Sequence, residues 1–295
     1  MKKVLLLIFP LFVFAQSSFS FLNMPFIGKN SAAANIKSVI SSGADNLFNN
    51  PSLLNKNIYK NHILFSYQRA YQDLNTYKLG YFTKYDSNLS FGTNILNSKI
   101  ENIEIRTRPG EPQGKFDYNL FLTNIGTSYK IDKDLYVGLS LNYIYQTLSI
   151  DDESGYFVNM GLFYNDIIDK LSLGLYLNNY GNSNGLRNQK SKLPKTSGMG
   201  IVYQLTNIGN IGINTDYYYE LEYNIVDKKG LNKIAIDIDY NRIMNVMIGY
   251  IINNEIYSFT YGFGITFGNI NFYYSYLPTK YQMGVNNSLN LKINW

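Results

Sequence analysis

Few residues in this chain could do chemistry, and they do not form a catalytic set. Asp237 and Asp239 stand two positions apart, which places both carboxylates on one face of a strand. Such a pair could act as general acid and base, but it has no supporting partner, so lining of a polar pore is the favoured interpretation. His62 is the single histidine, and there is no cysteine. A Ser-His-Asp triad and a His-rich or Cys-bound metal site are therefore disfavoured, and we predict no catalytic residue, no metal and no cofactor.

Two charged segments could bind ions. Asp151–Glu153 offers hard oxygen ligands to calcium but lacks the spaced acidic residues and the glycine of a dedicated loop, so a solvated loop is favoured. The other segment could contact lipopolysaccharide phosphates, with solvation again the favoured interpretation; it contains Arg187, Lys190, Lys192 and Lys195. The formal net charge of +5 falls by two to +3 if Lys2 and Lys3 leave with a leader, which does not indicate nucleic-acid binding.

Alternation of apolar and polar residues runs from His62 to the end of the chain. In 135–146, for example, Leu139 and Leu141 alternate with Ser140 and Asn142, as expected for a strand that has one apolar and one polar face. His62 opens the first strand and is predicted to mark an interface edge. The predicted strands are fourteen: 62–67, 77–85, 89–95, 116–131, 135–146, 155–165, 170–180, 197–205, 210–220, 231–240, 245–252, 257–268, 271–277 and 285–295.

The connections between these strands show a rhythm of short and long segments. Short connections rich in turn formers are predicted at 86–88, 132–134, 165–170, 206–210, 241–245 and 268–269. The long ones are predicted at 98–115, 148–154, 181–196 and 221–230. An outer-membrane barrel, whose chain ends both lie in the periplasm, has tight turns on that side and longer loops outside.

The two faces of the strands also differ from those of a small soluble barrel, which must fill its interior with apolar side chains. Here Tyr and Phe sit near strand ends on the apolar face, as interfacial girdles do. The polar face carries charges such as Lys233 and Asp237, which would be costly against lipid. The sequence therefore predicts an all-β fold, a transmembrane antiparallel β-barrel of about fourteen strands with its polar face inward.

The first sixty residues differ from the rest. Residues 1–15 have a basic start, an apolar stretch and Ala15 before a predicted cleavage site, which together indicate a signal peptide. Residues 16–60 are predicted to form a small N-terminal plug segment, with an exposed arm as the alternative, and 61–295 the barrel. The plug motif is a turn-rich knot that we expect to be structural; its residues include Asp45, Asn49, Asn50 and Pro51.

The last strand ends on an aromatic residue, Trp295, with an apolar face that includes Leu289 and Leu291. We expect it to pair with 63–67, which removes the last open edge of the sheet. Trp295 is predicted to lie at the periplasmic rim and to form part of the end that is recognised for membrane insertion.

Several stretches resemble the PorV/PorQ family of Bacteroidetes-type outer-membrane proteins, which are similar to FadL-type transporters. Phe21–Pro25 followed by Asp45–Leu54 resembles the family's N-terminal plug motif, with Ser52 where Ala is usual. Ala32–Asn35 stands where the family has a Gly-rich stretch. Further matching stretches are Arg106–Pro109, Gly114–Phe116, Val137–Tyr145, Leu193–Pro194, Ile248–Tyr250, Tyr261–Gly264 and Tyr274–Pro278.

The resemblance implies a FadL-like barrel with a plug and two functional directions, neither of them enzymatic. One is a part in type IX protein secretion, in which the barrel binds partners from the secretion machinery or its cargo. The alternative is a FadL-like channel for the uptake of hydrophobic small molecules. Either function places the chain in outer-membrane lipid of a Gram-negative cell.

Overall fold

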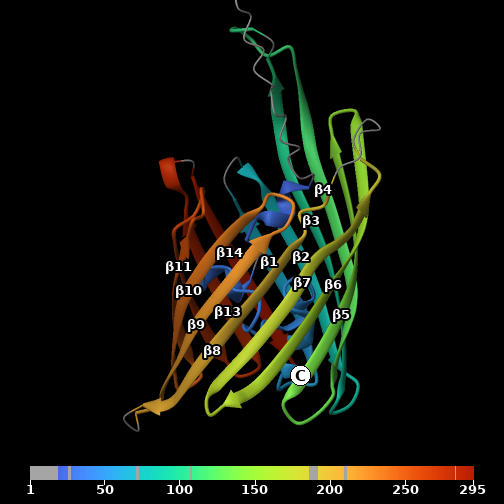
Figure 1. The fold of residues 1–295 in the computed structure, drawn as a ribbon. Helices are drawn as coiled ribbons and strands as arrows, with labels where there is room; N and C mark the ends of the chain where they lie inside the picture. The colour runs from blue at the N-terminus through green and yellow to red at the C-terminus, as the bar shows by residue number, and fades with distance from the viewer. Residues whose placement is uncertain are drawn as a thin grey trace, which may run out of the picture.

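A computed structural model of the chain describes residues 19–25, 28–70, 73–106, 108–185, 192–208, 211–282 and 284–295. Each strand pairs antiparallel with its neighbours in sequence, and β1 pairs with β14, so that fourteen strands close into one barrel (Figure 1). The predicted fourteen-stranded antiparallel barrel is thereby confirmed. The predicted leader, 1–15, lies outside the described residues.

The strands have the following bounds. The first seven are β1 (Asn61–Arg69), β2 (Asn75–Lys84), β3 (Leu89–Ile105), β4 (Gly114–Lys130), β5 (Leu135–Leu148), β6 (Asp151–Ile168) and β7 (Leu171–Ser183). The others are β8 (Thr196–Ile208), β9 (Ile213–Asn224), β10 (Lys229–Tyr240), β11 (Met244–Ile252), β12 (Phe259–Phe267), β13 (Ile270–Pro278) and β14 (Val285–Asn294).

The alternation of residue types sets which face of each strand is outside. In β5, Leu139 and Leu141 are exposed on the outer face, whereas Ser140 and Asn142 are buried inside. The same holds for Leu289 and the other apolar residues of β14. An outer surface of exposed Leu, Ile, Phe and Tyr around a polar interior is the arrangement that a bilayer stabilises, because hydrocarbon solvates the apolar side chains.

The closing seam pairs the last strand with the first, as predicted. Ile63 lies opposite Ile293, Phe65 opposite Leu291 and Tyr67 opposite Leu289. The backbones of Asn61 and Trp295 exchange hydrogen bonds of 2.9 and 3.0 Å, which complete the pairing at the end of the chain. No sheet edge is left open along β1 and β14.

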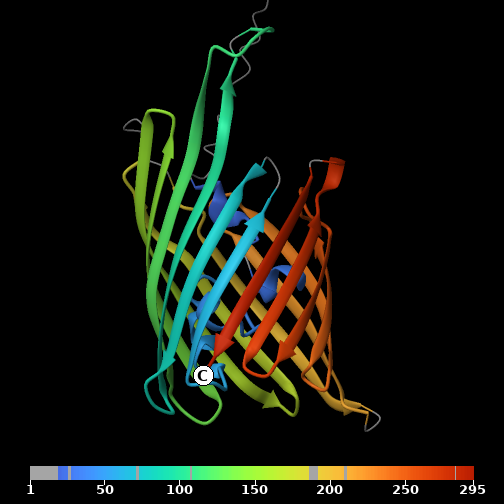
Figure 2. The ribbon, with the colours of Figure 1, turned by 180° about the vertical axis from the view of Figure 1, so that it is seen from behind.

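Within the described residues, the connections at one end of the barrel are tight turns, and those at the other end differ from the prediction; the predicted connections 181–196 and 206–210 lie partly outside the described residues. The expected loop 98–115 is largely strand, because β3 continues to Ile105 and β4 begins at Gly114. The resulting hairpin rises well beyond the rest of the rim (Figures 1 and 2). A bulge between Ile100 and Ile103, with Asn102 at φ 57°, shifts the alternation there, which is why the strand could not be seen in the sequence. The expected loops 148–154 and 221–230 are likewise shortened by longer strands.

The N-terminal segment lies inside the barrel, where Figures 1 and 2 show its blue ribbon behind the strands from both sides. It contains short helical turns: η1 (Ser20–Asn23), α1 (Lys29–Ala32), η2 (Gly43–Leu47) and η3 (Pro51–Lys56). Most residues of 28–55 are buried, so this part of the chain is the predicted plug and not an exposed arm. Within the described residues no helix is long and apolar enough to cross a bilayer.

Candidate functional site

The strands of the barrel wall have glycine at positions where the plug lies against their inner face. A Cβ atom on Gly161 would overlap the Asn50 side chain, and one on Gly138 would overlap the backbone of Pro51 and Ser52. The same overlap with the plug is found on other strands, at Gly174, Gly200, Gly249 and Gly262. The plug backbone therefore lies directly against the inner surface of the sheet, in space that only glycine leaves free.

Ion pairs join the plug to two parts of the wall. Lys29 Nζ lies 2.7 Å from Asp237 Oδ2 on β10, and Lys37 Nζ lies 2.9 Å from Glu222 Oε2 on the adjacent β9. Asp45 Oδ1 lies 2.5 Å from Lys78 Nζ on β2. Because β2 lies across the barrel from β9 and β10, these pairs fix the plug against rotation as well as displacement.

Glu220 on β9 is the centre of the densest group of polar contacts. Its Oε2 atom accepts hydrogen bonds from the backbone N–H of Lys37 and of Ser38, both at 2.7 Å, and from Ser38 Oγ at 2.6 Å. Its Oε1 atom lies 2.9 Å from Lys233 Nζ, which also donates to the Asn35 carbonyl. Glu220 and Lys233 are fully buried, and each compensates the charge of the other.

A different surface lies on the inner face of β3–β6. Here a group of buried apolar side chains, which we call the inner apolar patch, faces the lumen; it consists of Leu96, Leu120, Leu122, Ile144 and Phe157. Phe19, Phe21 and Leu22 of the N-terminal segment pack on this patch. Hydrogen bonds also reach this segment, from Asn224 Nδ2 to Asn23 and from Gln68 Nε2 to the Pro25 carbonyl.

The wall is interrupted beside the inner apolar patch. The pairing of β7 with β8 ends at Asn178 and Thr196, and Asn179 with φ 64° forms a bulge against β6. Asn179 donates to the Pro194 carbonyl at 2.9 Å. The adjacent Leu193 is buried and packs with the inner apolar patch, so a short segment without strand structure fills the wall at this point.

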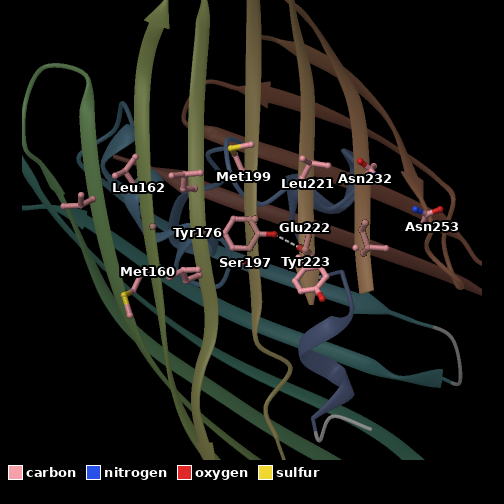
Figure 3. A pocket seen from close by; sticks show the side chains of 17 residues that line it. Met160, Leu162, Tyr176, Ser197, Met199, Leu221, Glu222, Tyr223, Asn232 and Asn253 are labelled. Atoms are coloured by element: carbon pink, nitrogen blue, oxygen red, sulfur yellow. Dashed lines mark hydrogen bonds between the residues drawn. The ribbon is translucent and has the colours of Figure 1, made fainter. Parts of the chain in front are cut away.

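An apolar groove of about 980 Å³ lies on the outer face of β6–β10. Its apolar side chains include Met160, Leu162, Leu175, Leu177, Met199 and Leu221. Figure 3 shows several of these side chains around Tyr176, whose hydroxyl donates to Glu222 Oε2 at 2.5 Å. Ser197 also lines this outer groove, four residues after Leu193, so one short segment of chain contacts both the inner apolar patch and the outer groove.

Of the four predicted plug-motif residues, Asp45 lies in η2, whereas Asn49, Asn50 and Pro51 lie directly before and at the start of η3. Asn50 caps this turn by accepting from Ser52 N at 3.2 Å, with Pro51 in the first position, as favoured at a helix start. Asn50 also donates to the Ser38 carbonyl at 2.7 Å, and the Asn49 carbonyl accepts from Asn178 on β7 at 2.8 Å. Asp45 forms the ion pair with Lys78. The geometry of this motif is that of a packed structural element.

Other predicted sites are placed differently. Asp151–Glu153 belongs to β6 and not to a solvated loop, because Glu153 is buried and accepts from Ser183 Oγ at 3.0 Å. Asp237 is also buried and holds Lys29, whereas Asp239 accepts from Arg242 N at 2.8 Å. The two carboxylates share the inner face but contribute to separate structural contacts. In the described part of the chain, no three potential ligand side chains gather to hold a metal ion.

His62 does not mark an interface edge. Its ring is fully buried in the lumen, stacks on Phe82 with centroids 4.7 Å apart, and accepts from Ala44 N at 3.0 Å. Of the basic segment, Arg187 and Lys190 lie outside the described residues. Lys192 is exposed, and the Lys195 ammonium lies 5.7 Å from the centroid of the Tyr180 ring. Trp295 is half exposed beside Tyr81, with ring centroids 6.5 Å apart.

The plug-to-wall contacts of Lys29, Lys37 and Glu220 are not predicted by the sequence. One signal was present, since Lys233 occupies an inward position of its strand, and an inward charge needs a partner. The partner segment could not be found, because Asn35 and Lys233 are separated by most of the chain.

A closed fourteen-stranded barrel with a plug in its lumen is the fold of FadL-like outer-membrane channels, and solved structures of that class are similar to this chain. The toluene transporter TodX of Pseudomonas putida has a TM-score of 0.62 at 13% identity, covering 92% of this chain and 98% of TodX. The CymD monoaromatic hydrocarbon channel has a TM-score of 0.62 at 12% identity, with the same coverage of 92% and 98%. A FadL homologue of Pseudomonas aeruginosa has a TM-score of 0.56 at 10% identity, covering 92% of this chain and all of that chain (100%).

At these identities the similarity establishes the fold. The sequence matches no protein-family model and no curated protein. The FadL-like part of the sequence resemblance is thus supported by structure, whereas these channels add nothing to the PorV/PorQ part.

Proposed function

We propose that this protein is an outer-membrane channel for the uptake of apolar small molecules. The proposal rests on the inner apolar patch. The wall of a water-filled pore is lined by polar side chains, whereas this patch presents five aliphatic and aromatic side chains to the lumen. Leu193 extends the patch to the interrupted wall beside the outer groove. Apolar surfaces on both sides of this part of the wall would lower the cost of passage of an apolar molecule.

The similar channels support the same function. TodX is described as a toluene transporter, and CymD as a monoaromatic hydrocarbon channel. For this chain we propose the same broad class of substrate, apolar molecules of about one aromatic ring, with export by the leader 1–15 and insertion in the outer membrane. The proposal includes no chemical step, since the described residues that face the lumen form no catalytic set.

The test is uptake of radiolabelled toluene by Gram-negative cells that lack their own FadL-like channels. Cells that produce the chain are expected to take up toluene faster than cells with an empty vector. Leu122→Asn places an amide in the inner apolar patch and should reduce this uptake. Leu139→Asn, on the outer face of β5, is the matched control. Equal uptake with and without the assembled barrel would refute the proposal.

A second candidate is a PorV/PorQ-like role in type IX secretion, as the sequence motifs imply. The hairpin of β3 and β4, which projects beyond the rim, is the surface that such a partner would contact (Figure 1). Crosslinking in native cells with a photoreactive group at Glu111, near the hairpin tip, tests it. Recovery of a secretion component or cargo would favour this candidate over the channel, and recovery of none would remove it.

A further inference from the structure

A small polar cavity lies between the plug and the closing strands, away from the inner apolar patch. Its volume is about 20 Å³, which exceeds the space that one water-sized occupant requires. Lys292 and Asn290 of β14 line it from the wall, and Lys29, Ser42 and Asp45 line it from the plug. The cavity therefore has room for a single small occupant and no more.

Unpartnered polar atoms face this region. Asn290 is 2% exposed, and neither its Nδ2 nor its Oδ1 atom has a hydrogen-bond partner among the described residues. On β1, Ser66 lies directly opposite Asn290, and its hydroxyl likewise has no partner there. A buried polar group without a partner costs about 1–3 kcal/mol, so an occupant that bonds to these groups stabilises the fold.

Among the described residues, one of the two ammonium groups that line the cavity has no direct carboxylate partner. The Lys29 ammonium is paired with Asp237 at 2.7 Å, and the Asp45 carboxylate with Lys78 at 2.5 Å. Lys292 has no carboxylate oxygen within 4.0 Å among the described residues. An ammonium group inside a protein without a direct partner is costly unless a counter-ion compensates it.

We propose that this cavity is a binding site for a monatomic anion of the size of chloride. The Lys292 ammonium supplies the charge, and the Asn290 amide, oriented with Nδ2 toward the cavity, supplies a neutral donor. The volume excludes phosphate, sulfate and carboxylates, which need several times more space. The anion joins the plug to the strand that closes the barrel, so the site is structural and is independent of what the channel transports.

Bromide replaces chloride and scatters anomalously, so it is the direct probe. The full chain is crystallised in detergent with sodium bromide, and the wild type is compared with Lys292→Gln. The expected result is an anomalous peak in the cavity within hydrogen-bonding distance of Lys292 Nζ, and its loss in the variant. A cavity that holds only water at high bromide, without anomalous signal, would overturn the proposal.

A second measurement does not depend on crystals. The midpoint of thermal unfolding of the detergent-solubilised barrel is compared in sodium chloride and in sodium gluconate, whose anion is too large for the cavity. Chloride should raise the midpoint of the wild type by about 2 °C or more, because it binds the folded state alone. Lys292→Gln should lose this difference, whereas Lys133→Gln, in an exposed turn, should keep it. An equal effect of the two salts on the wild type would contradict the proposal.

Discussion

The plug and the segment that precedes it are held in the same lumen by different sets of contacts. Residues 28–56 combine apolar packing against the wall with ion pairs, side-chain hydrogen bonds and backbone contact with wall glycines. Phe19, Phe21 and Leu22 instead pack on the inner apolar patch. Directional polar contacts are satisfied in one geometry alone, whereas apolar contacts can be replaced by any apolar surface of similar size. The comparison indicates that the plug is the fixed part of the lumen and the segment 19–25 is the exchangeable part.

The largest effect is expected from Glu220→Ala. It removes one of the two carboxylates that Lys233 contacts, so that Glu222 alone must compensate both Lys37 and Lys233. It also removes the acceptor of two plug N–H groups, and together these losses should cost about 3–5 kcal/mol. The measurement is the temperature at which the barrel loses its folded migration on a gel. Glu255→Ala removes a carboxylate from an exposed pair with Lys229 and serves as the control. Equal shifts for both variants would show that the plug is not held by Glu220.

A smaller effect is expected from Gly161→Val. The new side chain would occupy the space of Asn50, so the plug must shift or the wall must strain, at a cost of about 1–3 kcal/mol. Limited proteolysis of the plug measures this, since a displaced plug is cleaved faster. Gly230→Val is the matched variant on the outer face, where the nearest atom to the new Cβ is 3.9 Å away. If the plug of Gly161→Val were cleaved no faster than that of the wild type, contact with the wall glycines would not be what fixes the plug.

The apolar packing of the segment 19–25 on the inner apolar patch is tested by Phe21→Ala. Removing this ring exposes part of the inner apolar patch without breaking a plug-to-wall ion pair. Toluene uptake should therefore rise severalfold, while the thermal midpoint of the barrel changes less than in Glu220→Ala. Uptake assays on cells matched for the amount of assembled barrel make the measurement. A fall in uptake with an intact barrel would show that the segment 19–25 forms the path and does not fill it.

The smallest effect is expected in the projecting hairpin. Lys99 lies 2.8 Å from Glu101 and 3.2 Å from Asp117, but these side chains are exposed. Lys99→Gln should leave the temperature of unfolding nearly unchanged, because water and salt screen exposed pairs. The same gel assay applies. A loss similar to that of Glu220→Ala would mean that burial is not what distinguishes the plug contacts.

The sequence predicted the barrel well because alternation is a local signal with a period of two. It predicted less well where that period breaks, as at Asn102, where the bulge made strand residues resemble a loop. The register of the seam was predictable, since Leu289 and Leu291 must share the outer face with Phe65. The contacts of the plug were not predictable, because Glu220 accepts from backbone N–H groups, which almost any sequence at 37–38 would present.

The interior glycines have a consequence for how the molecule is made. Gly138 and Gly161 have no side chains, so the inner faces of their strands make few packing contacts until the N-terminal segment covers them. The seam between Asn61 and Trp295 is also the most distant pairing in the chain, and contacts of such sequence separation form late. The N-terminal segment, which is synthesised before the strands, would then provide the surface on which the sheet takes its curvature before the barrel closes. Its absence should leave open sheets that lack a defined diameter.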